Sequence, residues 1–68
     1  MSVYRVTEII GTSTKSWEDA AKEALTTAAA SLRDLRVAEV ISQDITMTDK
    51  GTIESFRTKL RVSFKYEK

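Results

Sequence analysis

The chain has 68 residues, eleven basic and ten acidic side chains for a formal net charge of +1, and no cysteine or histidine. Disulfides and the commonest zinc ligands are therefore excluded, and oligomerisation remains as the compensation that a small core usually needs. The charge balance argues against a general nucleic-acid or membrane-surface binder, and no stretch is apolar enough to span a membrane. We expect a soluble, cytoplasmic protein whose residues 1–68 form one domain.

Residues 3–10 are rich in β-branched side chains and predict a first strand, which ends at Gly11 and a polar turn over residues 12–14. Ser16, with Asp19 three positions later, indicates a helix start. Apolar residues then recur at helical spacing and predict a helix over about 17–34. Because its apolar stripe is mostly alanine, another element must approach this helix closely, and a sheet lying flat against it would do so.

Residues 37–47 predict a second strand, and residues 49–51 predict a hairpin turn in which Gly51 takes a positive φ. In the last strand the apolar residues Phe56, Leu60, Val62, Phe64 and Tyr66 alternate with polar ones, which predicts one face against the helix. At about 3.3 Å per residue this strand is longer than the helix that covers it, so part of it must project and needs another subunit. The predicted fold class is α+β, in the order β-α-β-β, with one helix packed on a three-stranded antiparallel sheet.

With this order of elements, the sequence resembles the dodecin family along essentially its whole length. The matching segments are residues 3–6, 10–13, Trp17 with the alanine-rich helix, 38–40 and 59–64. The resemblance implies a hollow shell of twelve identical subunits with cubic symmetry, in which trimers meet across two-fold axes. In many members it also implies paired flavins, stacked between tryptophans at the two-folds and stored rather than used in catalysis.

The chain departs from flavin-binding dodecins at Val37, where they carry a stacking tryptophan, and at Arg57, where they carry a glutamine that hydrogen-bonds the ring. Valine offers no aromatic face, so we expect weaker flavin binding, which the guanidinium of Arg57 partly restores by stacking or by pairing with a phosphate. Residues 36–38 and 43–44, with Arg57, are similar to a branch without this tryptophan that is associated with calcium. The resemblance places ligand contacts at Arg36, Val37, Thr46 and Arg57 near subunit interfaces, and it assigns no metal ligands.

Trp17 can be interpreted as a stacking platform, but its place on the apolar stripe favours a core or intersubunit anchor whose indole N–H reaches a backbone carbonyl or water. A basic row on the last strand suggests either a track for anions or single-stranded nucleic acid, or a sheet face paired with Glu8 and Glu39. The aromatic residues of that strand point to the opposite face, which favours the paired face. The basic row consists of Arg57, Lys59, Arg61 and Lys65.

Four carboxylates suggest either calcium ligands or surface charge, namely Glu39, Asp44, Asp49 and Glu54. No loop has the spacing of a preformed calcium site, so any such site must be assembled from several subunits. No catalytic residue is predicted, because no histidine can activate a nucleophile and both glycines are interpreted as single turn residues.

We therefore expect a non-enzymatic homododecameric shell that stores a small ligand or a cation at its subunit interfaces. The ligand is either a flavin, such as FMN or riboflavin, or Ca²⁺, with no nucleic acid or membrane partner. The alternative is a calcium-binding or purely structural cage without an organic ligand.

Overall fold

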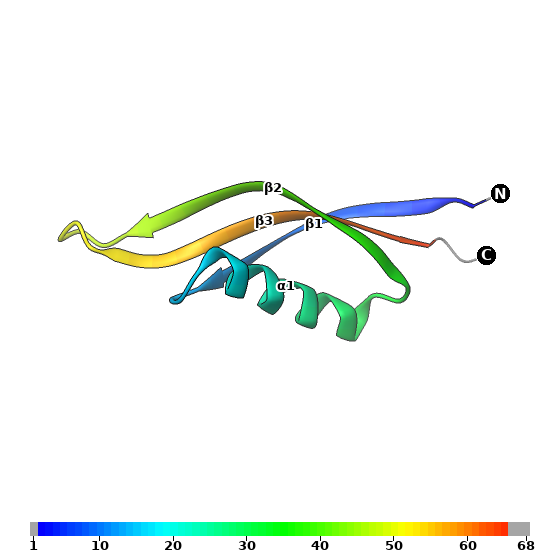
Figure 1. Ribbon diagram of the computed structural model, residues 1–68, viewed down its shortest axis with the longest axis horizontal. Coiled ribbons are helices and arrows are strands. Elements are labelled where there is room, and N and C mark those ends of the chain that lie inside the picture. The colour runs from blue at the N-terminus through cyan, green and yellow to red at the C-terminus, as the bar shows by residue number, and fades with distance from the viewer. Residues whose placement is uncertain (1, 66–68) are drawn as a thin grey trace.

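The structure is a computed structural model that describes residues 2–65 (Figure 1). Strand β1 (Tyr4–Ser13) is followed by helix α1 (Trp17–Ser31), strand β2 (Leu35–Met47) and strand β3 (Ile53–Lys65). The three strands form one antiparallel sheet in the order β1-β3-β2. The predicted α+β class and β-α-β-β order are confirmed. Tyr66, which the alternation assigned to the last strand, lies outside the described residues.

The polar segment at the end of β1 belongs to the sheet. Strand β1 continues through Gly11 and Thr12 to Ser13, and these residues pair with residues 56–58 of β3. The predicted strand end at Gly11 and the turn at residues 12 and 13 were therefore wrong. Pairing with the long central strand supplies the backbone hydrogen bonds of this segment, and these outweigh its local preference for a turn.

Helix α1 begins where the sequence predicted and ends earlier. The hydroxyl of Ser16 accepts a hydrogen bond from the backbone N–H of Asp19 at 3.0 Å, as an N-cap does. The helix ends at Ser31, with Leu32 as its C-cap, rather than at about residue 34. Asp34 has a φ of 56°, in the left-handed region, and precedes β2, which begins at Leu35.

Gly11 allows the helix to lie close to the sheet. A β-carbon at Gly11 would overlap the carbonyl oxygen of Ala20 and lie 2.8 Å from the β-carbon of Ala24. Glycine is therefore required here by packing, and its interpretation as a turn residue was wrong. The close approach predicted from the alanine stripe is confirmed, since Ala20, Ala24 and Ala28 are the buried residues of α1.

The core lies between α1 and the central strand β3. Leu60 and Val62 of β3 are fully buried, and partly buried residues of β1, α1 and β2 pack around them. The one buried polar side chain among residues 2–65 is Thr58, whose hydroxyl donates a hydrogen bond of 2.8 Å to the carbonyl oxygen of Trp17. This bond satisfies the buried hydroxyl and ties the first turn of the helix to β3.

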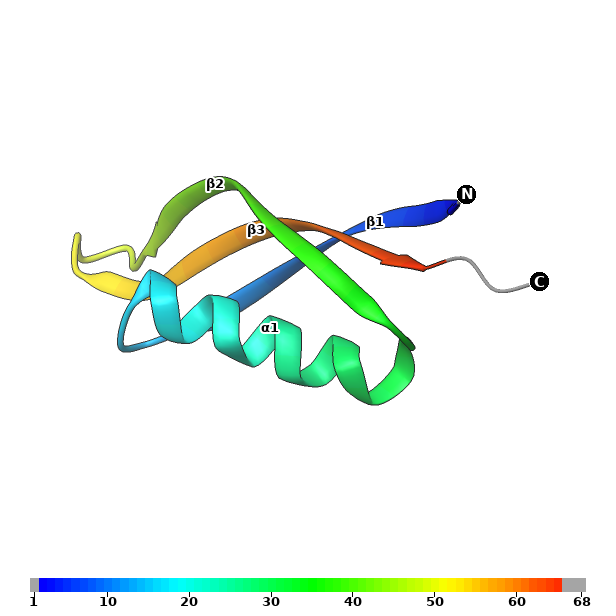
Figure 2. The same ribbon diagram turned by 45° about the vertical axis from the view of Figure 1, so that its right-hand side comes forward.

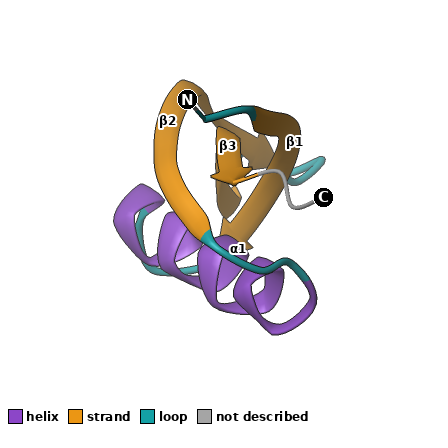
Figure 3. Ribbon diagram, turned by 90° about the vertical axis from the view of Figure 1, so that its right-hand side faces the viewer, coloured by secondary structure: helices purple, strands orange, loops and turns teal. Residues whose placement is uncertain are grey.

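The sheet extends beyond the helix at both ends. The described chain measures 52 × 19 × 15 Å, and the hairpin that joins β2 and β3 projects past α1 on one side (Figures 1 and 2). At the other end, β1 and β3 project together, and α1 lies against only one side of the curved sheet (Figure 3). Large apolar side chains are exposed on these extensions, among them Val3, Tyr4 and Val6 at one end and Met47 and Ile53 at the other.

Candidate functional site

The sheet face that points away from α1, here called the outer face, carries the basic row of β3. Side chains alternate along a strand, so Arg57, Lys59 and Arg61 share this face while Thr58 and Leu60 point to the helix. The register of the neighbouring strands places Asp44 opposite Arg57, and both Glu8 and Glu39 opposite Arg61.

The opposing charges on the outer face form ion pairs across the strands. The guanidinium of Arg61 lies 3.2 Å from the carboxylate of Glu8 and 3.6 Å from that of Glu39, and Lys59 lies 3.5 Å from Glu8. The hydrogen bond from Arg61 and the charge of Lys59 hold the pKa of Glu8 below its ordinary value. The predicted pairing with Glu8 and Glu39 is confirmed for Lys59 and Arg61 of the basic row, whereas Arg57 pairs with Asp44.

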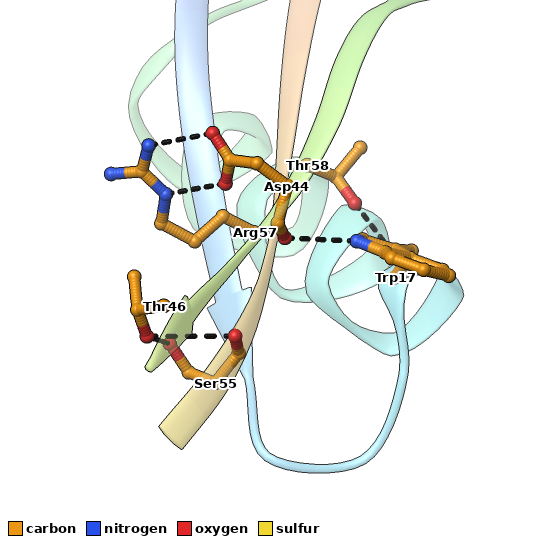
Figure 4. A network of polar contacts seen from close by, with 6 residues as sticks. All are labelled: Trp17, Asp44, Thr46, Ser55, Arg57 and Thr58. Carbon is orange, nitrogen blue, oxygen red and sulfur yellow. Dashed lines mark hydrogen bonds and ion pairs between the residues drawn. The ribbon is translucent and has the colours of Figure 1, made fainter. Parts of the chain in front are cut away.

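Arg57 and Asp44 form the shortest of these pairs (Figure 4). Arg57 donates from Nε to one carboxylate oxygen of Asp44 and from Nη2 to the other, each at 2.7 Å. These hydrogen bonds lower the pKa of Asp44 and raise the pKa of Arg57. This is the two-point geometry with which a guanidinium recognises a planar anion.

Trp17 holds the same segment of β2 from the helix side of the sheet. Its indole N–H donates a 3.0 Å hydrogen bond to the backbone carbonyl of Asp44 (Figure 4). Its ring meets Phe56 edge to face, with the ring centroids 5.2 Å apart. The predicted bond from the indole to a backbone carbonyl is confirmed, and it fixes the position of Asp44 independently of the Asp44 carboxylate.

Two further hydroxyls lie next to this ion pair on the outer face. Thr46 follows Asp44 by two residues and faces Ser55 across the strands, with 2.6 Å between their hydroxyl oxygens (Figure 4). A small hollow of about 170 Å³, here called the Arg57 pocket, is lined by Ile10, Ser42, Asp44, Arg57 and Lys59. Sequence reasoning missed Ile10 and Ser42 because they belong to different strands and meet only through their pairing with β3.

The predicted ligand residues fall into two groups rather than one. Thr46 and Arg57 lie together, but Val37 is paired with Ser63, six residues from Arg57 along β3. At about 3.3 Å per residue, Val37 and Arg57 are roughly 20 Å apart. Arg36 lies next to Val37 at an irregularity of the register, 4.0 Å from Asp34. A single chain therefore does not bring the four residues into one pocket.

The carboxylates considered as calcium ligands are also dispersed. Asp44 and Glu39 face different arginines, four residues apart on β3, and are therefore about 13 Å from each other. Asp49 lies in the connection between β2 and β3, and Glu54 lies near the start of β3. Within residues 2–65, no group of three or more acidic, histidine or cysteine side chains is arranged to hold a metal ion.

A larger groove runs between the edge strand β1 and helix α1, with a volume of about 660 Å³. Its walls combine apolar side chains such as Ile9, Ile10 and Leu32 with the polar Glu23 and Thr27. Sequence reasoning did not identify this groove, because it depends on the angle at which the helix crosses the sheet. No helix in the described part of the chain is both long and apolar enough to cross a membrane.

These features define a small α+β chain with one helix on a three-stranded antiparallel sheet, projecting strand ends and an ion-paired outer face. The chain belongs to the dodecin family, whose model matches residues 3–67. It is 55% identical over 65 residues to the calcium dodecin of Mycobacterium tuberculosis. The aligned region covers 96% of this chain and 90% of that relative.

Solved structures agree with this assignment. A crystal structure of the Mycobacterium tuberculosis calcium dodecin, described as calcium-chelating with a novel calcium-binding site, matches with a TM-score of 0.86 and 53% identity. The match covers 97% of this chain and 93% of that one. Dodecin from Streptomyces coelicolor matches with a TM-score of 0.92 and 33% identity, covering 98% of this chain and 94% of that one.

Proposed function

We propose that this chain is the subunit of a homododecameric hollow shell that binds and sequesters a small ligand or cation rather than catalysing a reaction. The observation that carries this proposal is the division of the ligand residues: Arg36 and Val37 lie at one end of β2, and Val37 is roughly 20 Å from Arg57 and roughly 26 Å from Thr46. A pocket that uses both groups needs a second copy of the chain. The exposed apolar side chains on the projecting strands supply surface for such contacts.

The assembly is tested by native mass spectrometry and light scattering. Twelve chains of 7.6 kDa give a particle of about 91 kDa. We expect this mass at micromolar protein concentration, with trimers as the first product of dissociation. A stable monomer under the same conditions would contradict the shell, and with it the placement of the ligand residues at interfaces.

Calcium is the ligand that we infer first, because the chain is 55% identical to a calcium dodecin. Further oxygen donors lie near Asp44, since the hydroxyls of Thr46 and Ser55 are on the same face, two residues further along their strands. Calcium takes six to eight oxygens at about 2.3–2.6 Å, whereas the carboxylates of Asp44 and Glu39 in one chain are about 13 Å apart. Residues of several copies would therefore complete the site.

Calcium binding is tested by thermal unfolding of the assembled protein in the presence of increasing calcium. A ligand that binds only the folded state raises the melting temperature, and the rise continues with concentration beyond Kd. Magnesium serves as the control, because its smaller ion demands a stricter octahedral site and should stabilise less. An unchanged melting temperature at all calcium concentrations would contradict this ligand.

A flavin such as FMN or riboflavin is the second candidate, favoured by the exposure of Val37. Val37 is 62% exposed on the outer face and Arg57 presents a guanidinium there, so both are accessible to a planar ring. Titration of FMN or riboflavin with the protein, followed by quenching of flavin fluorescence, separates the two ligands. Saturable quenching would support a flavin store, and no quenching together with calcium-dependent stabilisation would support the cation.

A further inference from the structure

The two cations that line the Arg57 pocket are each held by a carboxylate of a neighbouring strand. Arg57 donates hydrogen bonds from Nε and Nη2 to Asp44, each at 2.7 Å, and Lys59 lies 3.5 Å from Glu8. The other residues of the lining, apart from Asp44 itself, are uncharged. The positive charges that would attract an oxyanion to this pocket are therefore already balanced within the sheet.

The Asp44 carboxylate takes the place that an external oxyanion would need. A phosphate binds a guanidinium through two parallel hydrogen bonds, and Asp44 already uses two donors of Arg57 in this way. Asp44 lies directly opposite Arg57 in the register of β2 and β3, and Trp17 binds its backbone carbonyl. The hydrogen bonds from Arg57 also lower the pKa of Asp44. The backbone therefore keeps an ionised carboxylate at the guanidinium.

We propose that Asp44 is a specificity-determining residue that closes the Arg57 pocket to phosphate and other oxyanions, so that a ligand bound there carries no phosphate group. This inference rests on the proposed binding shell and narrows the class of its ligand. A guanidinium whose edge is hydrogen-bonded can still stack on a ring through its planar face. Of the two flavins, the pocket thus accepts riboflavin at least as well as FMN, and the pairing of Arg57 with a phosphate is not expected in the wild type.

The exclusion of phosphate arises from competition and from repulsion. The side chains of Arg57 and Asp44 are 41% and 52% exposed, so water screens their attraction. Even so, an exposed pair with this two-point geometry is closed about fivefold more often than it is open. A phosphate that enters the pocket also lies close to the Asp44 carboxylate, and the two anions repel each other even in water. Together, these effects should weaken phosphate binding by about tenfold.

The test measures binding of inorganic phosphate to the assembled protein in calcium-free buffer, by phosphorus-31 NMR titration. Asp44→Asn removes the negative charge at the guanidinium and keeps the backbone carbonyl that Trp17 binds. This variant should bind phosphate about tenfold more tightly than the wild type does. Asp44→Ala, which also removes the side-chain acceptor, should bind phosphate at least as tightly as Asp44→Asn. Native mass spectrometry checks that each variant keeps the wild-type assembly.

Two controls separate this local exclusion from a general effect of charge. Glu18→Gln removes the same charge from an exposed residue in the first turn of α1, and its phosphate affinity should equal that of the wild type. Asp44→Asn combined with Arg57→Gln lacks the guanidinium, and the gain in phosphate affinity should then disappear. An equal gain in Glu18→Gln, or a gain that persists without Arg57, would overturn the inference.

The outcomes distinguish this inference from the proposed function. The same phosphate affinity in the wild type and both Asp44 variants, or no binding to any of them, would overturn the exclusion and leave the shell standing. Fluorescence titration with FMN and riboflavin tests the class of ligand: riboflavin should bind the wild type at least as tightly as FMN does, and Asp44→Asn should prefer FMN. A wild type that prefers FMN would overturn the exclusion. Absence of quenching with both flavins would contradict only the flavin candidate, because the phosphate titrations decide the role of Asp44 independently.

Discussion

Replacing Gly11 by alanine tests the contact that joins the helix to the sheet. The new methyl group would overlap the Ala20 carbonyl oxygen and lie 2.8 Å from the Ala24 β-carbon, both on α1. Neither atom can rotate away, so the helix must move off β1. Overpacking a well-packed site costs about 1–3 kcal/mol, and a clash with backbone belongs to the upper end of that range. With about 4–8 °C of melting temperature per kcal/mol in a domain of this size, Tm should fall by roughly 10–20 °C.

The assay is thermal unfolding followed by circular dichroism at one fixed protein concentration, because assembly makes Tm depend on concentration. Gly51→Ala is the matched control. Gly51 has a φ of 82°, and a β-carbon there would meet nothing within 4 Å. That variant should lose only the cost of a left-handed alanine, about 1–2 kcal/mol. A Gly11→Ala protein that melts at the wild-type temperature would refute the close packing of α1 on β1.

Three further results are expected. Val37→Trp should raise the affinity for FMN by about tenfold or more in fluorescence titrations, since a ring stacked on an aromatic contributes about 1–3 kcal/mol; an unchanged affinity would place the flavin pocket elsewhere. Thr58→Val should lower the urea midpoint by the equivalent of about 1 kcal/mol, because it removes the bond to the Trp17 carbonyl; no change would show that this bond is dispensable. The free energy of unfolding should be constant from neutral pH down to about pH 5 and fall below about pH 4. The ion pairs of the folded state lower the pKa values of Glu8 and Asp44. These carboxylates therefore stabilise the fold fully above their pKa values in the unfolded chain, and this stabilisation is lost as they are protonated in the folded protein. Urea titrations across pH check this, and Asp44→Asn should flatten part of the decline.

The central strand was predictable because its periodicity and its burial have the same cause. Leu60 and Val62 alternate with charged residues, and in the structure they face the helix while Arg61 faces away. The helix was equally predictable from the spacing of its alanines. Gly11 was not, because a glycine before a polar tripeptide has the local signature of a turn, and only the pairing with β3 reveals it as a strand residue beneath a helix.

The site was predictable in its residue types and not in its arrangement. The basic row and its carboxylate partners follow from alternation, but which carboxylate meets which arginine depends on register. Strand β2 shifts register against β3 at three places, between Leu35 and Val37, between Val40 and Ser42, and between Thr46 and Met47. Each shift changes which residues of β2 and β3 face each other beyond it. Neither the pairing of Asp44 with Arg57 nor the distance of this pair from Val37 could therefore be obtained from the sequence.

The distribution of aromatic side chains bears on the choice of ligand. Trp17 and Phe56 are in contact with each other on the helix side of the sheet, and Phe64, which shares their side of β3, lies 5.7 Å from the guanidinium of Arg5. Among residues 2–65, the remaining aromatic side chain is Tyr4, which lies opposite Lys65 at the projecting end of the sheet. The part of the outer face around Arg57 thus presents oxygen donors and cations without a ring on which a flavin could stack. Such a surface selects ions by charge and geometry, which is why we infer calcium before a flavin as its ligand.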